Sequence, residues 1–245
     1  MTRQHPIRRA AIFGASGGIG AAMVELLAAD PNCERIYAGS RTPKSTTDPR
    51  ITPFAFDLTD EGSIAAAAAT MTADGPLDFV FVATGILHDG ADYGPEKATR
   101  ALNPARMARM LAINTIGPAI IAKHLVPLLP RRERGVFAAL SARVGSISDN
   151  RLGGWHSYRA SKAALNMLVR TIAIEAAQRQ PESVIVTLHP GTVDTRLSAP
   201  FQRGVAPEKL FTPSMSAASL LSVVDTLAPA DSGGLFAWDG ERLPY

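Results

Sequence analysis

Gly14-Ala15-Ser16-Gly17-Gly18-Ile19-Gly20 separates a short apolar run, 7–13, from a run rich in Ala, Leu, Met and Glu, 21–29. The first run is typical of a strand and the second of a helix. Glycines let the backbone approach a phosphate closely, and the first turn of a helix presents free N–H groups to it. The stretch therefore predicts a strand, a phosphate-binding turn and a helix, although its Gly-x-x-x-Gly-x-Gly spacing differs from the commoner Gly-x-Gly-x-x-Gly.

Strand-like and helix-like segments alternate along the rest of the chain. We expect strands at 35–39, 51–56, 77–83, 135–140, 183–188 and 235–238, and helices at 61–71, 105–129, 157–180 and 214–227. This alternation predicts a parallel sheet with helices on both faces. No break in composition and no repeat divides the chain. We therefore predict an α/β fold with a Rossmann-type doubly wound parallel sheet of about seven strands, in a single domain over residues 1–245.

The end of the second expected strand, Ser40-Arg41, carries no acidic residue. In dinucleotide-binding folds an acid here binds the free ribose 2′-hydroxyl, whereas an arginine accommodates a 2′-phosphate. Arg41 is a planar donor suited to phosphate, and Ser40 adds a hydroxyl. The pair favours NADP over NAD, the alternative being a plain surface arginine. After the third strand, Asp57 could contact the adenine or cap the next helix, with Thr59 and Asp60 as competing caps.

Tyr158 and Lys162 stand four residues apart in a helix-like run, so their side chains share one face. A free phenol titrates near pH ~10 and is a poor base at neutral pH. One positive charge at ~4 Å, at an effective dielectric constant of ~20, would lower that pKa by about the 3 units needed. The pair could therefore transfer protons, although an exposed Tyr/Lys ladder would look the same. Leu165 and Val169 continue this face, which places the pair beside the core.

Asn114 lies on the apolar face of the expected helix 105–129, together with Met107, Met110 and Leu111. An amide on such a face must be hydrogen-bonded, either to the backbone or to a water chain that leads to an active site. Pro118 should kink the helix just beyond it.

Polar residues also follow other expected strands, at the edge where open α/β sheets hold ligands. They are Thr84-Gly85, Ser141 and the run from Pro190 to Thr195. The segment that follows, about 196–213, contains three prolines and is expected to form a substrate lid.

The overall composition sets further limits. Cys33 is the only cysteine, which excludes an internal disulfide and a thiolate metal cluster, and the five histidines show no metal-ligand spacing. The net charge is +3, and we interpret the cluster Arg131, Arg132 and Arg134 as a solvated turn. No run approaches the ~20 apolar residues of a membrane span. We expect a cytoplasmic protein without metal, nucleic-acid or membrane partners.

Taken together, these motifs resemble the short-chain dehydrogenase/reductase family over essentially the whole chain. The matching motifs are Gly14-x-x-x-Gly18-x-Gly20, Ala83-Thr84-Gly85 at the family's Asn-Ala-Gly, Asn114, Tyr158-x-x-x-Lys162, and Pro190-Gly191 with Thr195. The run 145–166 resembles the subgroup of C-factor and sniffer-like carbonyl reductases. Members of that subgroup are described as reductases or as signalling proteins.

The resemblance implies a catalytic set of Tyr158, Lys162, Asn114 and a serine. Tyr158 would transfer the proton, Lys162 would hold the nicotinamide ribose and lower the tyrosine pKa, and Asn114 would hold a water in a proton relay. Alanine stands at 142, where the family has its catalytic serine, and we favour Ser141 over Ser146 as the substitute. The cofactor-binding residues implied are Gly14, Ser16, Gly18, Ile19, Gly20, Ser40, Arg41, Asp57, Leu58, Ala83, Thr84, Gly85, Tyr158, Lys162, Pro190, Gly191, Val193 and Thr195.

The expected function is that of an NADP-dependent oxidoreductase that transfers a hydride between a nicotinamide and a carbonyl or secondary alcohol, in particular a carbonyl reductase. The alanine at 142 motivates the alternative, an NAD(P)-binding signalling or regulatory protein with weak turnover. A nucleotide-sugar epimerase or dehydratase is disfavoured by the glycine spacing. Because family members often pair through the helices corresponding to 105–129 and 157–180, we expect a homodimer or homotetramer.

Overall fold

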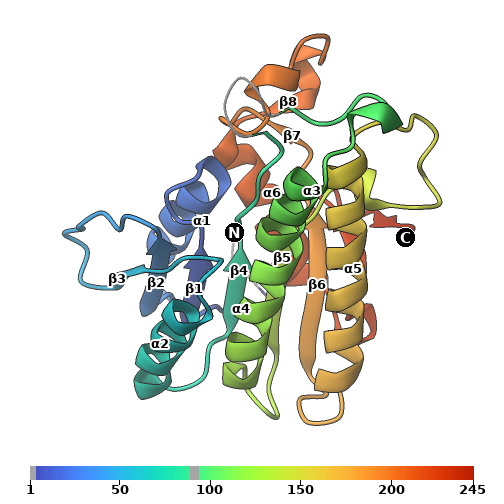
Figure 1. Ribbon diagram of the computed structural model, residues 1–245. Coiled ribbons are helices and arrows are strands. Elements are labelled where there is room, and N and C mark those ends of the chain that lie inside the picture. Colours follow the sequence, from blue (N-terminus) through green and yellow to red (C-terminus); the bar gives the residue numbers. More distant parts are fainter. Residues whose placement is uncertain (1–3, 89–93) are drawn as a thin grey trace.

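The computed structural model describes residues 4–88 and 94–245. The strands of its main sheet (Figure 1) are β1 (Arg9–Phe13), β2 (Arg35–Ser40), β3 (Ile51–Ala55), β4 (Phe79–Val82), β5 (Gly135–Leu140), β6 (Ser183–His189), β9 (Leu235–Ala237) and β10 (Arg242–Leu243). They lie in the order β10-β9-β6-β5-β4-β1-β2-β3, and all neighbours are parallel except β10 and β9. The predicted Rossmann-type doubly wound sheet is confirmed. It has one strand more than expected, because the two residues of β10 pair with β9.

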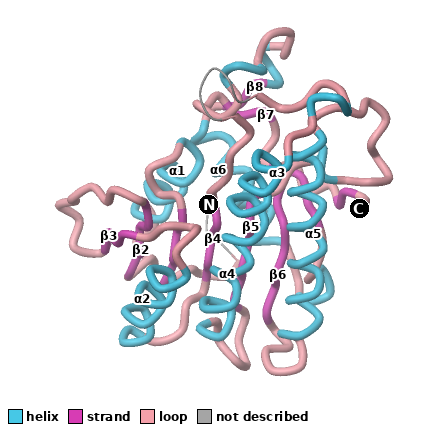
Figure 2. The backbone as a smooth tube through the Cα atoms, in the orientation of Figure 1, coloured by secondary structure: helices cyan, strands magenta, loops and turns pink. Residues whose placement is uncertain are grey.

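Helices cover both faces of this sheet, as Figure 2 shows. They are α1 (Gly18–Ala28), α2 (Glu61–Met71), α3 (Pro104–Leu111), α4 (Gly117–Leu125), α5 (His156–Ala176) and α6 (Pro213–Thr226). Helices α1 and α6 pack on one face, and α2, α4 and α5 pack on the other. Because side chains alternate along a strand, Ile12 belongs to the first core cluster and its neighbour Phe13 to the second.

The helix expected at 105–129 is interrupted in the middle. A π-helical turn, Ala112–Ile116, joins α3 to α4, with Asn114 at its centre. Pro118 lies in the first turn of α4, directly after the irregularity. A π turn inside a helix breaks the regular hydrogen-bond ladder and is frequent at functional sites.

The same helical run, Pro104–Leu128, is long and apolar enough to cross a membrane by length and composition alone. In the fold, however, Ile121, Ala122 and Leu125 pack into the second core cluster. We attribute the apolar character of the run to this packing. That the protein crosses no membrane stays a prediction.

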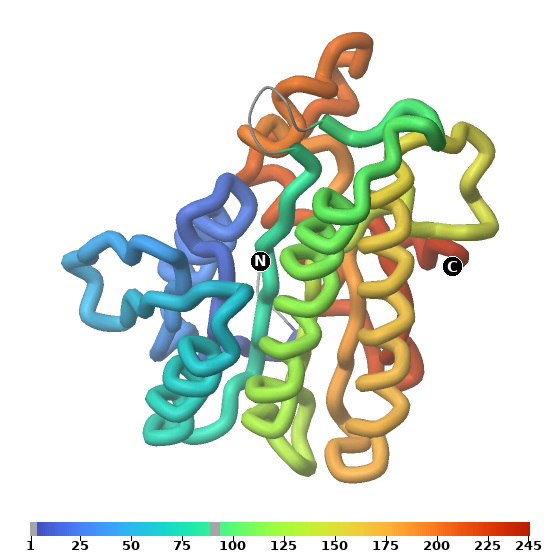
Figure 3. The backbone as a smooth tube through the Cα atoms, viewed as in Figure 1, coloured from blue at the N-terminus to red at the C-terminus, as the bar shows by residue number. Residues whose placement is uncertain are grey.

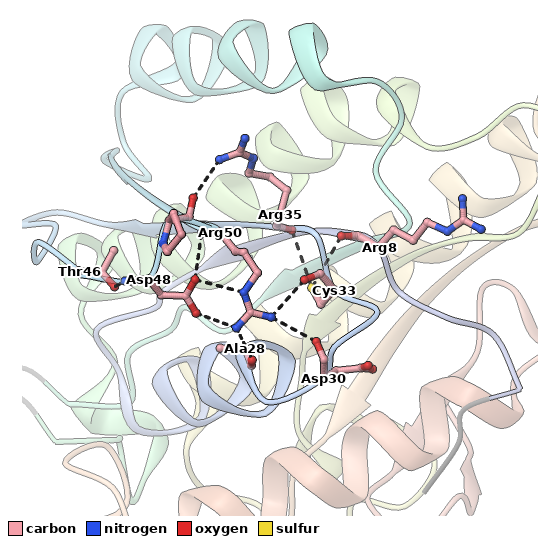
Figure 4. Close-up of polar contacts among 9 residues, drawn as sticks. Arg8, Ala28, Asp30, Cys33, Arg35, Thr46, Asp48 and Arg50 are labelled. Carbon is pink, nitrogen blue, oxygen red and sulfur yellow. Dashed lines mark hydrogen bonds and ion pairs between the residues drawn. The ribbon is translucent and has the colours of Figure 1, made fainter.

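Arg50, just before β3, ties the C-terminal end of α1 to the sheet (Figure 4). Its guanidinium donates to Ala28 O at 2.6 Å and to the backbone oxygens of Asp30 and Cys33 at 3.4 Å. A short ion pair with Asp48, at 2.7 Å, orients the guanidinium. These bonds satisfy carbonyls at the end of α1 that have no partner within the helix.

A second, two-stranded sheet lies beyond the carboxyl ends of the main strands. It pairs β7 (Thr192–Val193) with β8 (Leu210–Phe211) in parallel. Figure 3 shows the chain between them rising above the sheet. The expected lid segment is therefore partly ordered, with short 3₁₀ turns at Ala199–Phe201 and Pro207–Lys209.

Candidate active site

The glycine turn after β1, here called the cradle, is packed too tightly against other backbone for side chains at Gly14 and Gly20. Gly14 has φ +95°, and a Cβ there would lie 3.0 Å from the carbonyl group of Ala83. A Cβ on Gly20 would lie 2.2 Å from Gly14 O. The N–H groups of Gly14 and Ala15 donate to Gly39 O at 2.9 and 2.8 Å, so the turn is fixed to the end of β2.

The N-terminus of α1 is open to an anion. Its cap residue is Gly17, no side chain among the described residues caps the helix, and its first turn contains no acidic residue. The backbone of this turn includes Gly18, Ile19 and Gly20, which the sequence assigned to the cofactor. Free N–H groups and the positive end of the helix dipole suit a pyrophosphate, so the donors present fit a dinucleotide.

The end of β2 brings one cation and one buried hydroxyl to this cradle. Ser40 is buried, whereas Arg41 is exposed. Hydrogen bonds from Thr59 lower the pKa of Asp57, and the charge of Arg41 contributes in the same direction. Arg41 and Asp57 therefore lie close enough to interact, on the side of the cradle where the adenosine ribose is expected.

The competition for the N-cap of α2 is resolved in favour of Asp60, whose carboxylate accepts from Gly62 N at 2.9 Å. Asp57 instead accepts from the N–H and hydroxyl of Thr59, at 2.7 and 2.6 Å, and remains exposed. Leu58 packs on α4, where a Cβ on Gly117 would lie 2.7 Å from its side chain. Asp57 is thus free to face a ligand at the edge of the cradle, while Leu58 anchors the turn.

The residues after β4 lie between the cradle and α5. The hydroxyl of Thr84 is buried and has no partner among the described residues, which marks a place for a polar group of a ligand. A Cβ on Gly85 would lie 3.2 Å from Asn114 Oδ1 and 3.6 Å from Lys162 Nζ. The turn Ala83-Thr84-Gly85 is therefore where the cradle meets the catalytic candidates.

Asn114 is completely buried and bound to protein atoms. Its amide exchanges two hydrogen bonds with the backbone of Ile86, each 2.8 Å long. Its Nδ2 also lies 3.1 Å from Ser161 Oγ and 3.0 Å from Met110 Sδ. The sequence left open whether this amide bonds to the backbone or to a water chain, and in the structure it bonds to the backbone. Asn114 thus joins the turn after β4 to α5, one residue before Lys162.

Tyr158 and Lys162 are buried side by side, with Lys162 Nζ 5.8 Å from the centre of the phenol ring. Nζ donates to Leu140 O at 2.9 Å. Burial raises the pKa of Tyr158 to about 12 and lowers the pKa of Lys162 to about 8. The expectation that Lys162 lowers the tyrosine pKa is therefore wrong for this state, because loss of hydration outweighs a charge at that distance.

Ser141, which we favoured as the substitute for the missing serine, has another partner in the structure. Its hydroxyl donates to Asn166 Oδ1 at 2.7 Å, on the far side of Lys162 along α5. Ala142 instead packs in one apolar cluster with Tyr158. The hydroxyl oxygen of Ser146 is buried and accepts from Asp149 N at 3.1 Å. Adjacent residues of an extended chain point in opposite directions, which places Ser141 behind the site.

The turn after β6 closes the other side of the cradle. Gly191 is left-handed, with φ +78°, and Ser216 holds Pro190 O at 2.9 Å. Val193 is buried in β7. A Cβ on Gly18 would lie 2.8 Å from Thr195 Cγ2. The run Pro190–Thr195 therefore lies against the glycine turn, where a nicotinamide would have to enter.

Tyr158 packs in a small apolar cluster, and most of this cluster was missed from the sequence. Its buried members are Leu87, Met110, Ala142 and Tyr158, and its partly buried members are Ile86, Val144, Trp155, Leu197 and Phe201. Leu197 and Phe201 come from the expected lid. Trp155 was noted only as part of a family-like run. Two glycines before a tryptophan at a helix start, Gly153-Gly154-Trp155, were the available signal.

A phosphate-binding cradle that faces a buried tyrosine and lysine, at the carboxyl edge of a parallel sheet, defines a nicotinamide-dependent oxidoreductase. The short chain dehydrogenase family matches residues 8–205 of the chain. The chain belongs to this family and is an NAD(P)-dependent dehydrogenase/reductase.

Individual relatives differ in their described roles. C-signal from Myxococcus xanthus is 34% identical over 180 residues, which cover 73% of this chain and 99% of C-signal. A 1-hydroxy-2-glutathionyl-2-methyl-3-butene dehydrogenase from Rhodococcus is 33% identical over 77% of this chain and 78% of its own. Among solved structures, NADPH-bound carbonyl reductase from chicken fatty liver has a TM-score of 0.85 and 26% identity, covering 98% of this chain and 100% of its own.

Proposed function

We propose that the protein is an NADP-dependent carbonyl reductase. The observation that carries this proposal is the position of Tyr158, which is buried beside Lys162 and packs in the apolar cluster with Leu87, Met110 and Ala142. Apolar surroundings suit an uncharged carbonyl compound, whose oxygen would exchange a proton with the phenol. The likeness to the NADPH-bound chicken carbonyl reductase supports the same activity.

The nicotinamide, when bound, supplies the hydride chemistry. The protein's own part is to hold the dinucleotide through the glycine turn and the run Pro190–Thr195, and to deliver a proton from Tyr158 Oη to the substrate oxygen. We assign Lys162 to hold the ribose of the nicotinamide. Asn114 keeps the turn after β4 attached to α5, which fixes the distance between cradle and proton donor.

The preference for NADP rests on Arg41 and Ser40. Their site contains no competing acid at the end of β2, and Arg41 is exposed and able to meet a 2′-phosphate. The nearby carboxylate of Asp57 interacts with Arg41 and offsets part of its attraction for a phosphate. We therefore propose a preference for NADPH that is clear but not absolute.

The deciding experiment measures NADPH consumption with a panel of aldehydes and ketones, for the wild-type protein and for Tyr158→Phe. We expect turnover by the wild type and a loss of at least about a hundredfold in the variant. NADPH affinity, measured by fluorescence titration, should stay within about twofold. Wild-type protein that binds NADPH but reduces none of the panel would overturn the proposal.

A second candidate is a signalling or regulatory protein with weak turnover. It is favoured by Ala142, which leaves no hydroxyl at the family's serine position, and by the similarity to C-signal. Under this alternative, NADPH binds tightly and changes a partner interaction while turnover stays slow on every carbonyl tested.

We also propose that the protein self-associates through α4 and α5. Ile116, just before α4, and Met167 and Ile174 on α5 are apolar and more than half exposed. Light scattering on the wild type and on Met167→Glu tests this: a monomeric wild type overturns it.

A further inference from the structure

Trp155 is the one non-glycine residue, among residues 4–88 and 94–245, with a left-handed backbone. Its φ is 53° and its ψ is 38°, and it follows two left-handed glycines, Gly153 and Gly154. A bulky side chain rarely adopts this conformation, because its Cβ crowds the following carbonyl oxygen. The surrounding structure must therefore hold the residue in place.

Contacts on both sides hold this turn. Trp155 N–H donates to Glu96 O at 2.5 Å, and Arg159 Nε donates to Gly154 O at 3.0 Å. Arg159 also reaches Val144 O, at 3.1 Å, and so fastens the start of the same loop. The strained residue is thus clamped between the loop before α3 and the first turn of α5.

Glu96 also binds α5 through its side chain. Its carboxylate is 7% exposed and accepts from Ser157 N at 3.1 Å and from the Ser157 hydroxyl. Burial favours the neutral acid, but these hydrogen bonds and nearby His156 together hold the pKa of Glu96 below its usual range. Trp155 makes no side-chain capping bond to the helix it precedes. Glu96 therefore caps the catalytic helix from another part of the chain.

The contacts that hold this turn place the indole of Trp155 beside Tyr158. The Trp155 ring lies 6.2 Å from the Tyr158 ring and 5.2 Å from the Phe201 ring, both in edge-to-face geometry. Phe201 belongs to the lid segment between β7 and β8. The indole therefore lies between Tyr158 and the lid, packed against the apolar cluster that contains Tyr158.

Building on the proposed carbonyl reductase activity, we propose that Trp155 determines substrate specificity and that Glu96 is the residue that positions it. The backbone strain at Trp155 is retained because it sets the indole against Tyr158 and Phe201. This wall favours carbonyl compounds with an aryl group over small aliphatic ones, since a ring packs edge-to-face on fixed aromatic side chains.

The first test is thermal and does not depend on turnover. Trp155→Gly and Trp155→Ala both remove the indole, so the difference between their melting temperatures reports the backbone strain at this position. We expect the glycine variant to melt about 2 °C or more above the alanine variant, because glycine adopts a left-handed conformation without crowding. Equal melting temperatures, or a more stable alanine variant, would overturn the role given to strain.

The second test measures selectivity as the ratio of kcat/KM for acetophenone to that for 2-butanone, with NADPH. In Trp155→Ala this ratio should fall about three- to tenfold, and Trp155→Phe should retain most of it. Glu96→Ala should lower the ratio similarly with NADPH affinity unchanged. Glu96→Gln should restore it, because its amide oxygen still accepts from Ser157 N. Wild-type ratios in Trp155→Ala and Glu96→Ala overturn the proposal.

Asp78 provides a matched control, because its carboxylate also accepts two hydrogen bonds, from the N–H groups of Arg8 and Arg9 at 2.8 Å each. These bonds lie at the opposite end of the sheet. Asp78→Ala should lower the melting temperature and leave the selectivity ratio unchanged. A changed ratio in this control would show that any loss of stability alters selectivity, which also overturns the proposal.

A further readout separates this inference from the proposed function. The chain has two tryptophans, so in a Trp238→Phe background the emission comes from Trp155 alone. Adding Glu96→Ala should shift that emission to longer wavelength as the indole becomes more exposed. A wild type that reduces neither ketone counts against the proposed function; the emission and thermal tests then decide the inference, and an unshifted emission overturns it.

Discussion

Ser141 and Asn166 are joined by a buried hydrogen bond in which Ser141 Oγ donates to Asn166 Oδ1 over 2.7 Å. The bond lies one helical turn beyond Lys162 and uses the only proton that the Ser141 hydroxyl has to give. Ala142, the next residue, packs with Tyr158 and offers no hydroxyl. At the end of this strand the polar side chain, Ser141, thus faces Asn166, and the apolar one, Ala142, faces the cluster around Tyr158.

We predict that Ala142→Ser raises kcat for carbonyl reduction by about tenfold or more. A hydroxyl at this position would donate to the developing charge on the substrate oxygen, and single donors of this type change kcat by about 10²–10³ in other enzymes. Steady-state kinetics with NADPH and an aryl ketone provide the measurement. An unchanged or reduced kcat, in a variant that binds NADPH normally, would contradict the placement of Ala142.

For Ser141→Ala we expect the opposite pattern. Stability should fall by about 1–3 kcal/mol, because the buried amide of Asn166 loses its partner, whereas kcat should stay within about threefold. Denaturant unfolding and steady-state kinetics on the same preparation separate the two effects. If kcat collapsed while stability stayed the same, Ser141 would be returned to the catalytic set.

Removal of the Lys162 ammonium should stabilise the protein at neutral pH. Burial lowers the pKa of Lys162 to about 8, so between pH 8 and about 10.5 the unfolded chain binds a proton that the folded protein has released. The wild type therefore gains stability as pH rises through this window. At pH 7 the free energy of unfolding of Lys162→Met should exceed that of the wild type by up to about 3 kcal/mol, reduced by the loss of the hydrogen bond to Leu140. This difference in stability should disappear towards pH 10.5.

Denaturant titrations of both proteins from pH 7 to 10.5 measure this gap. Lys123→Met is the control, since Lys123 is exposed and ion-paired with Glu61, and its difference from wild type should stay small and flat. A constant gap for Lys162→Met across the range would rule out the lowered pKa.

The two reaction directions should respond differently to pH. Burial raises the pKa of Tyr158 to about 12, so the phenol is protonated throughout the neutral range and ready to donate to a carbonyl oxygen. Oxidation of an alcohol needs the phenolate, whose fraction rises tenfold per pH unit below the pKa. We expect reduction rates that are flat from pH 6 to 8 and oxidation rates that climb beyond pH 9. An oxidation plateau below pH 9 would show that the occupied site lowers the tyrosine pKa.

Replacement of Arg41 should separate the two cofactors. Arg41→Ala should weaken NADPH binding about tenfold and leave NADH binding within about twofold, because only NADPH carries the 2′-phosphate. Fluorescence titration measures both affinities. Equal losses for the two cofactors would mean that Arg41 supports the fold of the cradle and does not select NADP.

The sequence predicted the order and type of the main elements because each carries a local signal. The strand at 135–140 and the helix at 61–71 were placed to the residue, since an apolar run and an alanine-rich run mark their own ends. Strands β7, β8 and β10 have two residues each, and their pairing depends on distant partners. No local pattern encodes such short contacts.

The site residues were predictable where their role follows from the interval between them in the sequence. They were unpredictable where the role depends on the orientation of a side chain in the fold. Tyr158 and Lys162 follow from a helical interval. The orientation of Ser141 depends on Asn166, 25 residues away, and the pKa of Tyr158 depends on how completely the fold buries its ring. The Trp155 wall arises from a turn fastened by Glu96, which lies far away in the sequence.

Within the described part of the chain, the Arg50 guanidinium has its hydrogen-bond partners between residues 28 and 48 (Figure 4). The contacts that lock α1 onto β3 are therefore local in sequence, and the loops that they close are short. Short loop closure is fast and loses little chain entropy. We expect the first βαβ unit, including the glycine turn, to assemble early during synthesis, before the segment that carries Tyr158 has left the ribosome.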